Sequence, residues 1–283
     1  KHFSVNQMLA KDSVASRLES GGISYTEFSY QVMQAFDYLE LFRRHNCALQ
    51  IGGSDQWGNI VAGVDLIRRV EAKSAHALTI PLLAKADGTK FGKTAEGAIW
   101  LDPTMTSAYA LFQFFLNSDD RDVEQLLKTF SFKSRSELEA LFESLKTNPG
   151  AREAHRELAR EVTTLLHGAD QAQKVEAAAK ALFGQGEIRD LDIETLKSAL
   201  AELPKTRIKK GEEIPSWVDL ITSSGVVESK SAARRVIKEG GAYLNNEKIT
   251  GEDFTPKSSD LLHGQFLLLR KGKRDLVAVE ITD

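Results

Sequence analysis

The first hundred residues alternate between helical and strand patterns, and this alternation limits the possible folds more than any other feature of the chain. Apolar residues recur every three or four positions in residues 27–42 and 59–70, a spacing that predicts amphipathic helices. A short apolar run follows each helix, at residues 48–51 and 77–83, and a polar, glycine-containing segment comes next. Helices that alternate with strands in this way favour α/β layering with parallel strands. Because only two strands are clear, we expect part of a larger sheet.

The rest of the chain divides by pattern into a helical region and a small mixed region. From residue 106 to about residue 200 the strand patterns vanish and helical patterns follow one another. Residues 204–213 contain Pro204 and a run of basic residues, and we interpret them as a linker. Residues 214–283 combine helical and strand patterns, with a hairpin signal at Asn245-Asn246. The predicted domains are therefore residues 1–103, residues 104–203 and, after the linker, residues 214–283.

Composition excludes several kinds of site. The 283 residues carry a formal net charge of −3, so any binding of nucleic acid must come from local basic patches. Cys47 is the only cysteine, which rules out a disulfide within the chain, and the six histidines lack the spacing of metal ligands. We therefore predict no metal bound by the protein. No signal peptide and no bilayer-spanning apolar run is visible, so no membrane association and a cytoplasmic location are expected.

Three polar side chains share one face of the helix predicted at residues 27–42. Tyr30, Gln34 and Asp37 lie at positions i, i+4 and i+7, which places a phenol, an amide and a carboxylate on the same side. On spacing alone, a polar stripe on a surface helix is the commoner interpretation. The strand that follows ends in Gly52-Gly53, where the backbone can approach a ligand closely. Ligands of open α/β sheets bind outside the carboxyl ends of strands, which favours a binding site here.

A second candidate site is the sequence Lys90-Phe91-Gly92-Lys93-Thr94 in the polar segment. A solvated charged loop is the ordinary interpretation of two lysines at this spacing. The functional interpretation is a phosphate clamp on a flexible hinge, which acts through positioning and electrostatics and needs no acid or base.

A third candidate site is a local concentration of basic residues near the C-terminus. They lie on the predicted helix at residues 230–239 and on the hairpin at residues 270–274. Basic clusters on one face are typical of contacts to phosphate groups, although a solvated helix face gives the same pattern. The residues are Lys230, Arg234, Arg235, Lys238, Arg270, Lys271, Lys273 and Arg274.

In this order along the chain, these segments resemble the tyrosine pocket, the adenylate-binding strand end and the lysine loop of bacterial tyrosyl-tRNA synthetases, which are class I enzymes. Residues 229–237 and 241–245 also resemble the S-four RNA-binding domain that ends these synthetases. The resemblance spans essentially the whole chain. It implies an α/β fold in which residues 1–103 are the second part of a Rossmann-like catalytic domain, followed by an all-helical anticodon-side domain and a small α+β S-four domain. A tryptophanyl-tRNA synthetase would share the catalytic fold, but the Tyr/Gln/Asp spacing and the C-terminal unit argue against it.

The resemblance also implies a role for each matching residue. Tyr30 and Gln34 would bind the α-amino group of tyrosine, and Asp37 would accept a hydrogen bond from its phenol. A buried carboxylate without a donor is costly, so Asp37 would penalise phenylalanine. The ribose and polar groups of the adenylate would be held at the strand end, and the departing pyrophosphate by the lysine loop. Of the strand-end residues, Gln56 would bind polar groups of tyrosine, and Gln50, Gly53 and Asp55 would bind ATP or the adenylate. The loop residues are Lys90, Lys93 and Thr94, of which Lys93 would also bind ATP.

The implied activity is that of a tyrosine–tRNA ligase, which forms tyrosyl-adenylate from tyrosine and ATP and then transfers tyrosine to tRNA(Tyr). Mg²⁺ would accompany ATP, since no protein ligands for it are visible. The family is homodimeric, and Tyr25 falls where the family has an aromatic residue near the dimer contact. We therefore expect a dimer contact across residues 1–30.

One family signature, His-x-Gly-His, does not occur in this sequence, and the chain begins at Lys1 without an initiating Met. We therefore expect a partial chain that cannot form adenylate unaided. The alternative, from a different class, is a non-catalytic RNA-binding protein that uses the helical and S-four domains. That alternative predicts salt-dependent binding of tRNA without binding of tyrosine.

Overall fold

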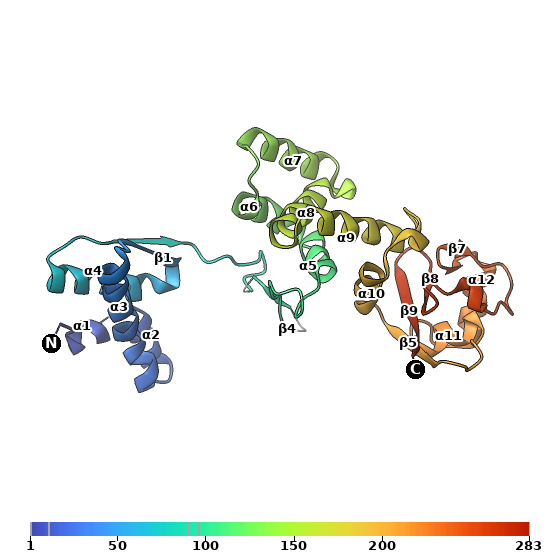
Figure 1. Ribbon diagram of the computed structural model, residues 1–283, viewed down its shortest axis with the longest axis horizontal. Helices are drawn as coiled ribbons and strands as arrows, with labels where there is room; N and C mark the ends of the chain where they lie inside the picture. Colours follow the sequence, from blue (N-terminus) through green and yellow to red (C-terminus); the bar gives the residue numbers. More distant parts are fainter. Residues whose placement is uncertain (1, 11, 90, 95–96, 283) are drawn as a thin grey trace. The chain divides into compact units, whose positions relative to one another are not determined.

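Figure 1 shows the computed structural model, which describes residues 2–10, 12–89, 91–94 and 97–282. The chain forms two compact units, Lys1–Phe91 and Gly92–Asp283. The boundary between the units precedes the predicted domain end at residue 103 and lies within the lysine-loop motif. The helical region and the C-terminal α+β region belong to the same unit.

The first unit has the predicted α/β layering. Strands β1 and β2 pair in parallel, with Leu49 opposite His76 and Gly53 opposite Ile80, and helix α4 connects them. This confirms the parallel pair expected from the sequence. The described elements are α1 (Val5–Leu9), α2 (Asp12–Ser20), α3 (Tyr25–His45), β1 (Leu49–Gly53), the 3₁₀ turn η1 (Ser54–Gln56), α4 (Trp57–Glu71) and β2 (His76–Ile80).

Helix α3 has well-defined ends and one buried face. Ser24 and Glu27 form a capping box at its start, and Asn46 ends it in the left-handed conformation with φ of 53°. Its buried side packs Ala35, Tyr38 and Leu39 against α4 in the core of this unit. The hydroxyl of Tyr38 donates a hydrogen bond of 2.8 Å to the carbonyl of His76, which ties α3 to strand β2. The opposite, polar side of α3 is thus held in a fixed orientation.

Helices dominate the first part of the second unit, as predicted. α8 packs against α5, α6, α7 and α9, and the fully buried side chains include Phe112, Leu127 and Leu158. In the described parts of the chain, no helix is both long and apolar enough to cross a membrane. The elements are the hairpin β3 (Lys93–Thr94) and β4 (Gly97–Ala98), α5 (Ala108–Leu116), α6 (Asp120–Phe130), α7 (Arg135–Thr147), η2 (Pro149–Ala151), α8 (Glu153–His167), α9 (Ala169–Leu182), η3 (Ile188–Asp190) and α10 (Ile193–Ala201).

The C-terminal region is a five-stranded sheet with the order β5-β9-β8-β6-β7. Two helices, α11 and α12, cover it, and Trp217 of α11 is completely buried in their shared core. The predicted hairpin is confirmed, because Asn245 and Asn246 connect β6 to β7 with φ of 47° and 70°. The elements are β5 (Lys205–Lys209), α11 (Trp217–Ser223), α12 (Lys230–Lys238), β6 (Ala242–Leu244), β7 (Glu247–Lys248), η4 (Ser258–Asp260), β8 (Phe266–Lys271) and β9 (Asp275–Thr282).

The interpretation of residues 204–213 as a linker is wrong for half of that segment. Lys205–Lys209 forms strand β5, which pairs in parallel with β9 at the edge of the sheet. Only Ile208 of this strand is buried, and the other side chains are polar. An edge strand with alternating basic residues is a common protection against aggregation, and it looks like a charged linker in the sequence.

Candidate active site and RNA-binding surface

The carboxyl end of β1 turns directly into helix α4 through η1. Side chains pack closely against both glycines before the turn: a Cβ atom on Gly52 would lie 2.9 Å from Cδ1 of Ile60, and one on Gly53 would lie 2.7 Å from Oδ1 of Asp55, so a larger residue would displace these side chains. Two hydrogen bonds then join the polar side chains of the turn. Nε2 of Gln56 donates to Oδ2 of Asp55 at 3.1 Å, and Nδ2 of Asn59 donates to Oε1 of Gln56 at 3.2 Å. Tight packing thus orients a carboxylate and two amides at the strand end.

A cleft of about 350 Å³ lies between this strand end and α3. Tyr30 of α3 lines it together with Asp55 and Gln56, so the structure brings three of the predicted site residues into one cavity. Gln34 and Asp37 follow on the same helix, but neither lines this cleft. Asp37 is exposed and Gln34 is half-buried.

Gln50 and Gly53 occupy β1 and are half-buried. Oε1 of Gln50 is buried and has no hydrogen-bond partner among the described residues. A buried acceptor without a donor is costly, so this oxygen has unused capacity for a ligand or a water molecule.

The sequence analysis missed Gln31, which lines the same cleft from the buried side of α3. Its side chain is 5% exposed, and its Nε2 donates a hydrogen bond of 3.2 Å to the carbonyl of Gly58 at the start of α4. It shares a helix face with Ala35 and Tyr38, which are core residues. The signal in the sequence is a glutamine at a position where the helical periodicity predicts an apolar core residue.

Two charged residues at the outer side of the cleft were also missed. Arg17 of α2 lies 3.3 Å from Glu27 at the start of α3, and both line the cleft. The backbone amide and hydroxyl of Ser24 hold the pKa of Glu27 below its ordinary value. Arg17 precedes the helix that carries Tyr30, Gln34 and Asp37, and Glu27 lies at the start of that helix, outside the recognised spacing.

The lysine loop is described only in part. Lys90 lies outside the described residues, and the backbone of Lys93 and Thr94 forms strand β3, which pairs with β4 in an antiparallel hairpin. Immediately before the motif, Oδ1 of Asp87 accepts hydrogen bonds from the backbone amide and hydroxyl of Thr89 at 2.9 and 2.6 Å.

The basic residues of α12 differ in how they are paired. Nζ of Lys230 lies 2.5 Å from Asp219, and Nζ of Lys238 lies 3.2 Å from Glu252. Arg234 and Arg235 are exposed on the same helix. The exposed arginines are therefore the side chains of α12 that are best placed to contact a phosphate.

Arg270 occupies a different environment from its neighbours on the basic hairpin. It is 9% exposed, its guanidinium lies 3.8 Å from the ring centroid of Tyr243, and Nη1 donates to the carbonyl of Gly272 at 2.9 Å. These contacts favour a role in fixing the hairpin rather than contact with RNA. Lys271 is half-buried and lies 3.4 Å from Asp275.

Lys273 and Arg274, at the tip of that hairpin, are exposed and line a groove of about 980 Å³ within the second unit. The groove is also lined by Asp119 in the connection between α5 and α6, by Asp120 at the start of α6, and by Arg152. Phe183, which follows α9 and is 44% exposed, lines it as well. The groove thus combines cations, carboxylates and an exposed aromatic ring.

Two further predicted features can be placed. Tyr25, expected near a dimer contact, is 83% exposed at the start of α3. Within the described ranges, no group of three or more His, Cys, Asp or Glu side chains is arranged to hold a metal ion.

Comparisons with known proteins cover nearly the whole chain. Residues 1–184 match the family model of class I tRNA synthetases for tryptophan and tyrosine, and residues 195–279 match that of the C-terminal domain of tyrosine–tRNA ligases. Tyrosine–tRNA ligase of Streptomyces coelicolor is 59% identical over 284 residues, which include all of this chain and 67% of the relative. The ligase of Corynebacterium efficiens is 54% identical over 99% of this chain and 67% of its own length. The chain thus spans about two thirds of the length of these relatives.

Solved structures give the same assignment. A C-terminally truncated mitochondrial tyrosyl-tRNA synthetase of Coccidioides posadasii matches with a TM-score of 0.52 and 36% identity over 62% of this chain and 50% of that structure. The corresponding protein of Aspergillus nidulans matches with a TM-score of 0.54 and 35% identity over 64% of this chain and 52% of that structure. With the family models, the close relatives and a cleft that joins Tyr30 to the strand end, the conclusion is that this chain belongs to the tyrosine–tRNA ligases, class I aminoacyl-tRNA synthetases of translation.

Proposed function

We propose that this chain provides the tyrosine- and adenylate-binding part of a tyrosine–tRNA ligase, together with its surface for tRNA(Tyr). A carboxylate oxygen of tyrosine attacks the α-phosphorus of ATP, the bond to the β-phosphate bridging oxygen breaks, and pyrophosphate leaves. A hydroxyl of the terminal ribose of the tRNA then attacks the carbonyl carbon of the tyrosyl-adenylate, the bond from that carbon to the phosphate oxygen breaks, and AMP leaves. The observation that carries the proposal is the cleft that Tyr30 shares with Asp55 and Gln56.

The cleft and the two elements that border it support a division of roles, in which Tyr30, Asp55 and Gln56 line the cleft itself and the other residues lie on the same helix or strand. Tyr30 and Gln34 bind the α-amino group of tyrosine, and Asp37, one turn further along α3, accepts the hydrogen bond of the substrate phenol. Gln56 also binds tyrosine, and Gln50, Gly53 and Asp55, with Lys93, bind ATP or the adenylate. Helix α4 begins at the same strand end, and the positive end of its dipole favours a negatively charged phosphate nearby.

The lysine loop and the metal complete the proposed chemistry. Lys90, Lys93 and Thr94 stabilise the charge of the departing pyrophosphate. Mg²⁺ is proposed to enter with ATP as part of the substrate. The His-x-Gly-His motif, absent from this sequence, would lie in the remaining third of the relatives' length, and the apolar side chains exposed on one face of β1 and β2, such as Ile51 and Leu78, offer a surface for that part.

The oligomeric state, the domain boundaries and the cellular location are also part of the proposal. Exposed Tyr25 supports a homodimer contact across residues 1–30. The catalytic part is proposed to be Rossmann-like and to extend to residue 103, residues 104–203 to be the anticodon-side domain, and the C-terminal sheet with α11 and α12 to be an S-four domain. An enzyme of translation acts in the cytoplasm, which is the proposed location.

The substitution Asp37→Ala tests the proposed tyrosine pocket. It is made in a ligase in which this chain is joined to the third of the relatives' length that it does not span. Loss of a hydrogen bond to a charged group costs about 1.5–3 kcal/mol, so kcat/KM for tyrosine in ATP–pyrophosphate exchange should fall by about 10- to 100-fold. Asp65→Ala is the matched control, because Asp65 is a partly exposed aspartate on the neighbouring helix α4. Equal rates for the wild type and Asp37→Ala would refute the pocket assignment.

The second candidate function is a non-catalytic RNA-binding protein. The groove that contains Lys273, Arg274 and Phe183 favours it, because cations with an exposed aromatic ring suit an RNA backbone and an unstacked base. This candidate predicts salt-dependent binding of tRNA by the chain and no binding of tyrosine by the completed protein. Binding of both ligands supports the ligase.

A further inference from the structure

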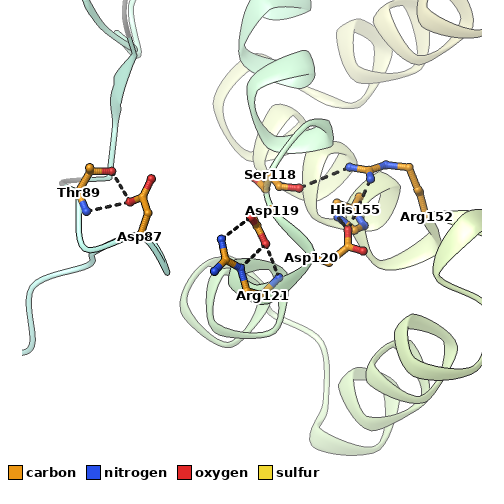
Figure 2. Close-up of polar contacts among 8 residues, drawn as sticks. All are labelled: Asp87, Thr89, Ser118, Asp119, Asp120, Arg121, Arg152 and His155. Carbon is orange, nitrogen blue, oxygen red and sulfur yellow. Dashed lines mark hydrogen bonds and ion pairs between the residues drawn. The ribbon is translucent and has the colours of Figure 1, made fainter.

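The groove described above has one wall without regular secondary structure. α5 ends at Leu116 and α6 begins at Asp120, and the residues between them, Asn117 to Asp119, line the groove. A segment of this kind keeps its shape only if other groups hold its backbone. The clamp that holds it is formed by side chains at the start of α8 and α6, which Figure 2 shows.

Arg152 is the centre of the clamp. Its Nη2 donates a hydrogen bond of 2.7 Å to the carbonyl of Leu116 and a longer one of 3.5 Å to that of Ser118, and its Nη1 lies 3.5 Å from Asp120. Arg152 also adopts the left-handed conformation, with φ of 49° and ψ of 35°. That conformation costs a residue other than glycine about 1–2 kcal/mol. Its use here by an arginine points to the side chain as the reason for the strain.

His155 supports Arg152 from inside the helical core. The side chain is completely buried, and its Nε2 lies 3.0 Å from Oδ1 of Asp120 (Figure 2). Burial, and the nearby charge of Arg152, lower the pKa of His155, so the ring is neutral near neutral pH. A neutral imidazole leaves the charge of Asp120 to pair with Arg152. His155 does not itself line the groove.

The other end of the segment is fixed in a similar way. Asp119 caps α6, and Oδ1 accepts hydrogen bonds of 2.9 Å from the backbone amide and from Nε of Arg121. The Arg121 guanidinium holds the pKa of Asp119 well below its usual range. The carboxylate of Asp119 is therefore ionised and held in a fixed direction.

We propose that His155 and Arg152 are positioning residues for RNA binding, which set the shape of the Asn117–Asp119 wall although His155 touches no RNA. The inference rests on the proposed RNA-binding function of the groove. A positioning role differs from a purely structural role in one consequence. A substitution of His155 must weaken RNA binding while the chain remains folded.

The test compares two substitutions at His155 in the chain as it exists. His155→Leu fills the space but removes the 3.0 Å polar contact to Asp120, and we expect the Kd for tRNA(Tyr) to rise about 10-fold because Asp120, and with it Arg152, is then held less firmly. His155→Gln keeps a side-chain NH₂ donor and should restore binding most of the way. The slope of log Kd against log salt should be the same in all three proteins, because no phosphate contact is lost.

A matched control separates positioning from stability. Glu176→Gln removes a carboxylate that is bonded to Arg160, also on α8. It should lower the melting temperature without changing tRNA affinity. The inference would be overturned by equal affinities of the wild type and His155→Leu, by an equal loss in the Leu and Gln variants, or by a matching loss in Glu176→Gln.

A second measurement does not depend on RNA. Hydrogen exchange of the amides of residues 117–119 should be faster in His155→Leu than in the wild type, and close to wild type in His155→Gln. Unchanged exchange would contradict the clamp itself. If the wild-type chain binds no tRNA, the proposed RNA surface and the positioning role both fail, and the exchange result still shows whether the clamp holds the wall.

Discussion

At the scale of single residues, Glu176 shows how contacts formed in the folded state lower the pKa of a carboxyl group. Its carboxylate accepts hydrogen bonds from Nε and Nη2 of Arg160 at 2.8 and 2.9 Å, and Lys180 lies 2.9 Å away. These cations, Arg160 first, lower the pKa of Glu176 from 4.5 to about 2. Because the pKa is depressed in the folded state, the stabilisation is present above pH 4.5 and is lost as the pH falls from there toward 2.

Glu176→Gln is therefore expected to lower the free energy of unfolding by about 1 kcal/mol near neutral pH, where the carboxylate is ionised. The difference from the wild type should shrink as the pH falls through the window between the two pKa values. Denaturant unfolding of the second unit at several pH values measures this difference in the free energy of unfolding. Glu139→Gln is the control, since Glu139 pairs with Arg135 on an exposed surface. A difference in unfolding free energy between the wild type and Glu176→Gln that stays constant with pH would contradict the lowered pKa of Glu176.

At the residue scale the sequence also had clear limits. The positions of Tyr30, Asp55 and Gln56 could be predicted because local spacing and the strand–glycine pattern place them. The burial of Arg270 could not be predicted, because its neighbour Tyr243 comes from another strand, β6. The same holds for Gln31, whose partner Gly58 lies 27 positions away.

At the scale of elements, helix α12 carries the clearest prediction for RNA. Lys230 and Lys238 are paired with carboxylates, whereas Arg234 and Arg235 lie exposed on the same helix. Charges that already have protein partners gain less from a phosphate than exposed ones. The binding contribution of this helix should therefore come mainly from the two arginines.

The double variant Arg234→Ala and Arg235→Ala should weaken binding of tRNA to the chain and reduce the slope of log Kd against log salt by about 2, one for each lost phosphate contact. The control is the double variant Arg44→Ala and Arg135→Ala, which removes the same charge from exposed side chains elsewhere. Titrations of the two double variants with tRNA at several salt concentrations give the two slopes to be compared. An unchanged slope in the α12 variant would remove this helix from the proposed surface.

Elements were predictable where their own residues determine them. α3, α4, β1 and β2 follow directly from apolar periodicity and end signals such as Asn46. Strand β5 was not predictable, because its pattern Lys-Thr-Arg-Ile-Lys becomes a strand only through pairing with β9, some 70 residues later. Long-range pairing of this kind leaves little trace in local sequence.

At the scale of the whole molecule, the chain contains two compact units and spans about two thirds of the length of its relatives. The cleft at the strand end is the proposed site for tyrosine and adenylate, and the second unit contains the proposed RNA surface. The sequence contains no His-x-Gly-His motif. We therefore expect the complete reaction to need the remaining third of the ligase as well as this chain.

The most direct test is tyrosine-dependent ATP–pyrophosphate exchange, measured with the chain alone and with the chain mixed with a separately made polypeptide that carries the His-x-Gly-His part. The account predicts exchange in the mixture, and none with either polypeptide alone. Exchange by this chain alone would contradict the need for the missing signature. A folded mixture that gives no exchange, although each polypeptide is shown to associate with the other, would contradict the assignment of the tyrosine and adenylate site to this chain.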